Sequence, residues 1–140
     1  LNNENVTGYL RDEKVGNMAS VSSAKPKVRA KLLQLQRDIA KENDVIMDGR
    51  DIGTFVLPNA DVKIYLTATV EERAKRRYAE LVEKGQDADL EKIAEDIRTR
   101  DYQDMNREIA PLKQAEDATL VDSSDMTIDE VTEAIIALCK

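Results

Sequence analysis

The residues best suited to chemistry lie together in the segment 45–54, which reads VIMDGRDIGT. A short β-branched run is followed there by Asp48, Arg50 and Asp51, with two glycines among them and just behind them. Because ligands of open parallel α/β sheets bind beyond the carboxyl ends of the strands, these side chains are expected at a binding site. A guanidinium donates two parallel hydrogen bonds to a phosphate, and a strand-end carboxylate can hold magnesium through its waters. The segment therefore predicts part of a phosphate and nucleotide site.

A second group of candidates is an arginine cluster on one predicted helix. Arg73, Arg76 and Arg77 are spaced so that all three lie on one side of that helix. Such a cluster fits a solvated face that pairs with neighbouring glutamates. It also fits a mobile segment that closes over phosphates, because the polar break 85–88 between two helices could act as a hinge.

A third group comprises Arg100, Asp104 and Arg107, at helical positions i, i+4 and i+7. Two arginines that flank a carboxylate can form an ordinary surface ladder of ion pairs, worth ~0.3–0.5 kcal/mol per pair. They can equally hold a phosphate and a sugar hydroxyl. The spacing alone leaves both interpretations open.

Ser20 and Arg29 are not distinguished by their residue types or spacing. Ser20 lies near the end of a Ser- and Ala-rich predicted helix, where a hydroxyl commonly caps the backbone or is solvated. Physical reasoning alone therefore assigns neither residue a role in binding.

The charge distribution argues against a nucleic-acid polymer as partner. The net charge is -7 and the pI is about 4.7. Residues 1–107 hold 19 Lys and Arg against 20 Asp and Glu, whereas residues 108–140 hold 2 against 8. Proteins that bind nucleic acids usually have a basic face and an elevated pI. We therefore expect the arginines to gather around a small anion.

Composition restricts the chemistry further. The 140 residues, 41% of them hydrophobic, suit one compact domain. The chain has no histidine, which excludes histidine bases and ligands, and one cysteine, Cys139, which cannot form an internal disulfide. A reducing cytoplasm is the expected location. No apolar run approaches the ~20 residues needed to cross a bilayer, so no membrane partner is expected.

Hydrophobic periodicity and end signals predict alternating helices and strands. The expected helices are 11–23, one with Pro26 in its first turn, one from a capping box at 69–72 to Gly85, one capped by Asp89, and one from a capping box at 127–130; the expected strands are 45–47, 62–66 and 119–121. Buried helix faces are expected at Val28, Leu32, Leu35 and Ile39, at Leu90, Ile93, Ala94 and Ile97, and at Ile128, Val131, Ile135 and Leu138. This order of elements favours an α/β fold with a parallel sheet and crossover helices.

Several short motifs occur together and in one order along the chain. They are DGRDIGT at 48–54, PNADVKIYLT at 58–67, ERAKRR at 72–77, RDYQDMNR at 100–107, APL at 110–112 and AEDA at 115–118, with further matches within 6–20 and 26–37. In these motifs the chain resembles the bacterial cytidylate kinase family over nearly its whole length. The resemblance implies the fold of the P-loop nucleoside monophosphate kinases.

The resemblance also implies roles for individual residues. The positions that meet the acceptor nucleotide are Ser20, Arg29 and Asp51 at the cytosine base, Arg50 and Arg107 at the monophosphate, and Arg100 and Asp104 at the sugar and neighbouring phosphates. Arg73 and Arg77 match a lid over the ATP phosphates, so the implied catalytic arginines are Arg50, Arg73, Arg77 and Arg107. Asp48 matches the place where related kinases anchor hydrated magnesium.

One motif of the family is missing from this sequence. The family has a strand followed by a Gly-rich phosphate loop that ends in Gly-Lys-Ser/Thr, which holds the ATP phosphates and magnesium. None of the five glycines here is followed by lysine, and the chain begins with Leu1. We therefore expect an incomplete kinase domain: the end of an acceptor-binding insert and the following helix at 1–40, core strands at 45–70, a lid at 71–90 and the C-terminal core at 91–140.

The expected activity of the intact protein is transfer of the γ-phosphoryl group of ATP to CMP or dCMP, with Mg²⁺, as part of pyrimidine metabolism. The chain alone is expected to be inactive and to self-associate through an exposed sheet edge. Two alternatives remain: another P-loop kinase for a small metabolite, and a non-catalytic nucleotide-binding or interaction module.

Overall fold

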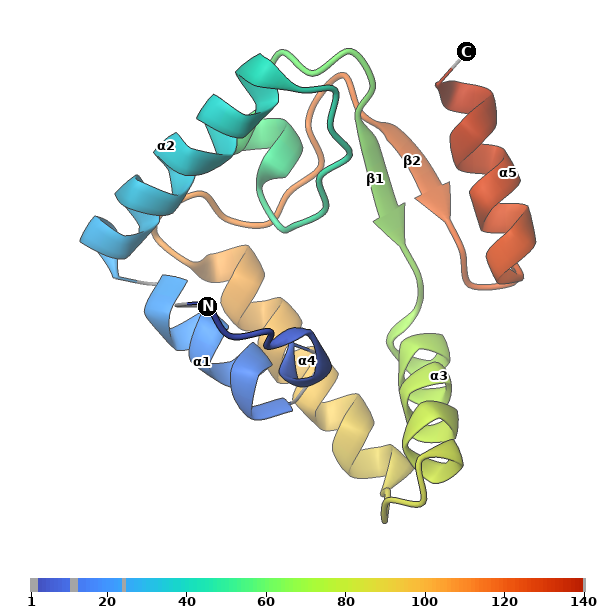
Figure 1. Ribbon diagram of the computed structural model, residues 1–140. Helices are drawn as coiled ribbons and strands as arrows, with labels where there is room; N and C mark the ends of the chain where they lie inside the picture. The colour runs from blue at the N-terminus through green and yellow to red at the C-terminus, as the bar shows by residue number, and fades with distance from the viewer. Residues whose placement is uncertain (1–2, 11–12, 24, 140) are drawn as a thin grey trace. The chain divides into compact units, whose positions relative to one another are not determined.

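The computed structural model describes residues 3–10, 13–23 and 25–139 (Figure 1). The chain divides into two compact units, residues 1–46 and residues 47–140.

The first unit consists of a short 3-10 turn, η1 (Thr7–Tyr9), followed in the sequence by a pair of helices. Helix α1 (Glu13–Ser23) and helix α2 (Pro26–Glu42) contact each other. Pro26 opens α2 because its fixed φ suits the first turn and its missing N–H is not needed there. Both predicted helices are thus confirmed.

The predicted burial of the α2 stripe is wrong. The exposed fractions are 40% for Val28, 45% for Leu32, 51% for Leu35 and 42% for Ile39. These residues do share one face of α2, but a pair of helices offers that face too little apolar surface to cover it. The periodicity of the sequence identified the apolar face correctly, but it does not show whether another element packs against that face.

The second unit contains the sheet. Strand β1 (Ile64–Thr67) pairs in parallel with strand β2 (Thr119–Asp122), with Ile64 opposite Thr119 and Thr67 opposite Asp122. The connection between the strands runs through α3 (Val70–Glu83) and α4 (Leu90–Asn106), which pack against each other, and α5 (Ile128–Leu138) follows β2. The parallel sheet with helical crossover is therefore confirmed.

The predicted strand at 45–47 is wrong. Among the described residues only β1 and β2 pair, and 45–47 is irregular chain, with Ile46 fully exposed. A β-branched run becomes a strand only when a neighbour accepts its backbone hydrogen bonds. No described segment does so here.

Side-chain caps fix the ends of the helices. Thr69 accepts from Glu72 N at α3, Asp89 accepts from Lys92 N at α4, and α5 has the full reciprocal capping box between Thr127 and Glu130. At α3 only half of the predicted box forms, because the Thr69 amide donates to Ser124 Oγ instead (2.9 Å).

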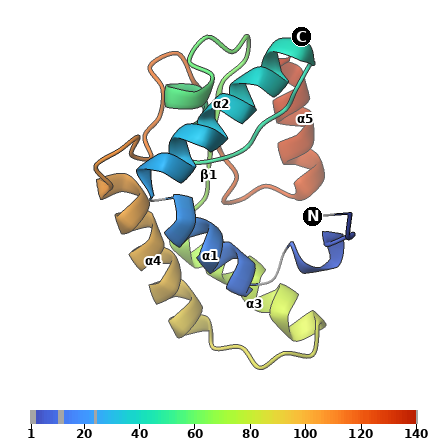
Figure 2. The same cartoon turned by 60° about the vertical axis from the view of Figure 1, so that its left-hand side comes forward.

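The turn after α3 also follows the prediction. Gly85 there has φ +68°, a conformation that favours glycine. Its amide and that of the next residue donate to carbonyls of the last turn, which closes the helix. Both views show this turn at the end of the α3–α4 hairpin away from β1 (Figures 1 and 2).

The buried core is small. Among the described residues, Val56, Ala68, Ala74 and Ser123 are the ones exposed by 8% or less. The predicted faces of α4 and α5 are half-buried except at their first residues, because Leu90 is 42% exposed and Ile128 is 85% exposed. No helix in the described part of the chain is long and apolar enough to cross a membrane.

Candidate active site

The loop that carries Arg50 and Asp51 is anchored by a π-helical turn, η2 (Ile52–Val56). The Asp51 carbonyl accepts from the amides of Phe55 (2.9 Å) and Val56 (3.1 Å), and the Val56 side chain is buried. A Cβ atom at Gly49 would lie 2.9 Å from Cγ1 of Ile52. Glycine at position 49 therefore allows the loop to pack against η2.

Two ion pairs join this loop to the C-terminal end of α4. Arg50 Nε donates to Asp104 Oδ2 at 3.0 Å, and Arg107 Nη2 lies 3.5 Å from Asp51 Oδ1. We refer to Arg50, Asp51, Asp104 and Arg107 as the ion-pair cluster. The adjacent loop residues Arg50 and Asp51 thus pair with Asp104 and Arg107, which lie about one helical turn apart at the end of α4.

The loop after α4 orients Arg107. Arg107 Nε donates to the carbonyl of Ala110 (2.6 Å), and the amide of Leu112 donates to the carbonyl of Asp104 (2.8 Å). Ala110 has φ 49°, a left-handed conformation that costs free energy for a residue other than glycine. Arg107 Nη2 is buried and makes no hydrogen bond with any residue that the structure describes. This nitrogen therefore retains an unused donor.

The cluster is balanced in charge and partly shielded from water. Asp51 and Asp104 are 12% and 14% exposed, Arg107 is 24% exposed and Arg50 is 44% exposed. Arginine binds carboxylates and phosphates through the same planar fork of donors. A phosphate could thus take the place of a carboxylate on Arg50 or fill the unused donor of Arg107.

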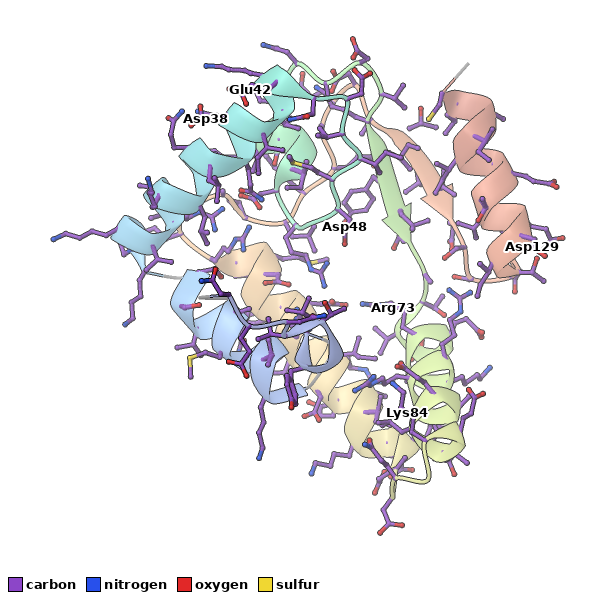
Figure 3. The ribbon with its side chains drawn as sticks, in the orientation of Figure 1. Asp38, Glu42, Asp48, Arg73, Lys84 and Asp129 are labelled. Atoms are coloured by element: carbon purple, nitrogen blue, oxygen red, sulfur yellow. The ribbon has the colours of Figure 1, made fainter. Side chains whose placement is uncertain are left out.

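A separate arrangement surrounds Arg73, in the first turns of α3 (Figure 3). Its Nη1 and Nη2 donate to the two carboxylate oxygens of Asp101 on α4, at 3.0 and 2.5 Å, and its Nε donates to the carbonyl of Ala68 at 3.1 Å. The hydrogen bonds to Asp101 raise the pKa of the Arg73 guanidinium further above its usual range. Arg73 is therefore bonded to two other segments of the chain.

The other two arginines of α3 differ from Arg73. Arg77 donates to Glu80 on its own helix at 2.9 Å, and hydrogen bonds from Lys84 and Arg77 lower the pKa of Glu80. Arg76 donates to the carbonyl of Ser123 at 2.5 Å and to its hydroxyl at 3.4 Å. In the described part of the chain, Arg77 is thus bonded only to a neighbour on its own helix, whereas Arg76 connects α3 to the loop after β2.

The structure does not gather the remaining predicted site residues into the cluster. Arg100 is exposed and has no hydrogen bond or ion pair with the described residues. Asp48 is exposed on the loop before Arg50 (Figure 3). Arg29 is half-buried on α2 in the other unit, and the side chain of Ser20 lies outside the part of the chain that the structure describes.

Two residues with well-defined contacts were not found from the sequence. Asp101 was hidden because its partner lies 28 residues away, and nothing in its spacing distinguishes it from other acidic residues of α4. Ser123 is 5% exposed, and its hydroxyl donates to the carbonyl of Thr67 at 2.9 Å. The signal for Ser123 was its position two residues after the end of a predicted strand.

The described residues contain no group of three or more His, Cys, Asp or Glu side chains that could hold a metal. Magnesium at phosphoryl-transfer sites commonly uses one or two carboxylates together with waters and substrate phosphates. The exposed carboxylate of Asp48 fits such an ion only as an indirect ligand, through water.

These features define the class of protein: an α/β protein with parallel strands and crossover helices, in which arginines and carboxylates pair at the end of α4. Residues 1–140 match the family described as "Cytidylate kinase". The chain belongs to the cytidylate kinase family, as its motifs predicted.

Curated relatives with the name cytidylate kinase agree with this assignment. The relative from Caldicellulosiruptor saccharolyticus is 51% identical over 138 residues, which are 99% of this chain and 61% of the relative. The relative from an Exiguobacterium species is 52% identical over 132 residues, 94% of this chain and 59% of the relative. The relative from Leuconostoc mesenteroides is 53% identical over 135 residues, 96% of this chain and 60% of the relative. The chain thus spans about 60% of the length of these relatives.

Proposed function

We propose that these residues belong to a kinase that transfers the γ-phosphoryl group of ATP to CMP or dCMP. In this reaction an oxygen of the acceptor monophosphate forms a bond to the γ-phosphorus. The bond from that phosphorus to the β,γ-bridging oxygen breaks, and the products are ADP and CDP or dCDP. The observation that carries the proposal is the ion-pair cluster, in a chain whose curated relatives are named cytidylate kinase.

In this proposal the cluster receives the acceptor nucleotide. Arg50 and Arg107 bind its monophosphate, which neutralises the charge that otherwise opposes phosphoryl transfer. Arg100 and Asp104 contact the sugar and neighbouring phosphates.

In this proposal, the residues that recognise the cytosine base are Ser20, Arg29 and Asp51. A carboxylate at Asp51 accepts from the N4 amino group of cytosine, whereas the carbonyl of uracil at that place would repel it. Arg29 and Ser20 donate to the N3 and O2 acceptors of the base.

The side of the site that binds ATP depends on an arginine of this chain and on a magnesium ion. We propose Arg77 as the lid arginine for the ATP phosphates, because it would give up one part-buried hydrogen bond, to Glu80 on its own helix, to reach them. Mg²⁺ would be held by the ATP phosphates and, through water, by Asp48. The Gly-rich phosphate loop of the family does not occur within residues 1–140.

A chimera tests this function. The part of the Caldicellulosiruptor saccharolyticus relative that lies upstream of its match to this chain would be fused before Leu1. ADP release would then be measured with CMP, dCMP, UMP and AMP as acceptors. We expect turnover with CMP and dCMP at the ~1–100 s⁻¹ typical of kinases, and slower turnover with the other acceptors.

A matched pair of variants gives the control. Arg107→Ala should abolish most of the turnover, whereas Arg98→Ala, on the same helix but bonded to Glu71 and Glu95, should retain it. A chimera that unfolds cooperatively and binds ATP, yet prefers another acceptor or is indifferent to Arg107→Ala, would show that the proposed function is wrong.

A further inference from the structure

Three segments of the second unit meet at one guanidinium. Arg73 of α3 donates to the carbonyl of Ala68, just after β1, and to both carboxylate oxygens of Asp101 on α4. The α3–α4 hairpin is closed at one end by the Gly85 turn, and Arg73 near the start of α3 and Asp101 near the end of α4 lie toward its other, open end. We refer to the bonds among Arg73, Asp101 and Ala68 as the clamp.

Among the described residues, two side-chain links join α3 and α4, and the clamp is the one with two hydrogen bonds to its carboxylate and the lower exposure. Its two hydrogen bonds to Asp101 are parallel, and the side chains of Arg73 and Asp101 are 35% and 20% exposed. The other link is the ion pair of Arg98 with Glu71, a single contact of 3.2 Å between side chains that are 50% and 66% exposed. Bidentate, partly shielded pairs fix geometry much better than single exposed ones.

The clamp lies next to the acceptor residues along α4. Asp101 precedes Asp104 by three positions and Arg107 by six, so it lies one turn before the first and about two before the second. Asp104 and Arg107 are the two residues through which α4 meets Arg50 and Asp51. Movement of α4 relative to β1 would therefore pull both ion pairs of the cluster apart.

We propose that Arg73 and Asp101 are positioning residues for the acceptor site, which hold the end of α4 at a fixed place relative to the end of β1. The identity of the acceptor in this proposal rests on the proposed function. Arg73 then differs from the phosphate contact that the family resemblance implies, because it would have to give up three hydrogen bonds to reach a phosphate. Its effect on the reaction is transmitted through Asp101 and α4.

The test uses the chimera with the upstream segment of the relative, which supplies the Gly-rich phosphate loop, and the variants Arg73→Met, Asp101→Asn and both together. CMP and ATP affinities would be measured by calorimetry, and the Nε–Hε signals of Arg50 and Arg107 by NMR without ligand. We expect each single variant to weaken CMP binding about 10-fold, as displaced supporting residues commonly do, and the double variant to weaken it no further. ATP affinity should stay unchanged, and both Nε–Hε signals should shift.

Two further variants complete the design. Glu71→Gln removes the other link between α3 and α4 and should change neither CMP affinity nor the Nε–Hε signals. Arg73→Lys keeps the charge without the planar fork, so it should lose part of the CMP affinity, and it serves as well if Arg73→Met does not fold.

Several results would overturn the clamp. The first is additive losses of CMP affinity in the single and double variants, and the second is an Asp101→Asn variant with unshifted Nε–Hε signals. The third is an Arg73→Met variant that weakens ATP binding when Asp101→Asn does not, which would identify Arg73 as a direct phosphate ligand. If the unaltered chimera binds no CMP, the proposed function fails, and the Nε–Hε signals still decide whether the clamp holds α4.

Discussion

At the scale of single residues, the carboxylates and guanidinia of the ion-pair cluster neutralise one another before any ligand arrives. In the proposed function, binding a nucleotide is therefore an exchange of partners, in which a phosphate or a base edge replaces an ion pair already made. An exchange favours the ligand that leaves no group of the site unpaired, because each buried unsatisfied polar group costs ~1–3 kcal/mol. The cluster is thus suited to selectivity.

This reasoning predicts different effects for two residues of the cluster in the chimera. Asp51→Ala should lower kcat/KM for CMP much more than for UMP, because Asp51 faces the cytosine amino group in the proposed function. Arg107→Ala should lower both values about equally, since both acceptors carry the phosphate. The measurement is kcat/KM for both acceptors in each variant. Equal losses for CMP and UMP in Asp51→Ala would assign Asp51 to the phosphate or to the fold.

The sequence predicted residue types better than residue contacts. Arg50, Asp51, Asp104 and Arg107 were selected from motifs and lie together in the structure. Arg73 was selected too, but its bond to Asp101 depends on how α3 and α4 cross, which no local pattern encodes. Sequence motifs therefore predicted which residues matter, but not which distant residues contact each other.

At the scale of helices and strands, the sequence predicted correctly those features that depend only on residues close together in the chain. Caps at Thr69, Asp89 and Thr127 and the left-handed Gly85 are decided within a few residues, and all were predicted. The strand at 45–47 and the burial of the α2 stripe failed because both depend on a neighbouring element. Periodicity identifies an apolar face, and packing decides whether it is covered.

The helix caps and loops also predict how stability responds to acid. Hydrogen bonds from the backbone and hydroxyl of Thr127 lower the pKa of Glu130, a bond from Lys63 lowers that of Asp117, and bonds from Ser124 lower that of Asp122. These carboxyls bind protons less readily in the folded chain than in the unfolded chain. Their stabilising effect is therefore complete above the unfolded values, 4.5 for Glu and 3.8 for Asp, and is lost as pH falls through the lower folded values.

Thermal unfolding followed by circular dichroism between pH 7 and pH 3 measures this effect. We expect a midpoint that is nearly constant near neutrality and falls below about pH 4.5. Glu130→Gln should lower the midpoint at pH 7 and reduce the further loss on acidification. A midpoint that rises between pH 5 and pH 3 would contradict the assignment of these bonds.

At the scale of the whole molecule, the dominant feature is exposed surface. In the described part of the chain, β1 and β2 pair only with each other, so each has one unpaired edge, and Leu66 and Leu120 are 53% and 55% exposed. Such edges and apolar surfaces favour association with another chain.

We therefore expect the 140-residue chain to self-associate, or to pair with an added upstream segment of a relative. Light scattering across a concentration series should give a mass that rises with concentration. Leu120→Lys, which places a charge on the exposed face of β2, should shift the mass toward the monomer. A monodisperse monomer at high concentration, with sharp cooperative unfolding, would count against this expectation.

We propose that residues 1–140 hold the acceptor half of a CMP kinase site, and that phosphoryl transfer needs the Gly-rich phosphate loop as well. The most direct measurement compares CMP-dependent ADP release by the 140-residue chain and by the chimera, at equal concentrations. We expect no measurable release from the chain, because none of its groups replaces the amides and lysine that hold the ATP phosphates, and turnover of ~1–100 s⁻¹ from the chimera. Turnover at that rate by the chain alone, or none by a folded chimera that binds both nucleotides, would contradict the account.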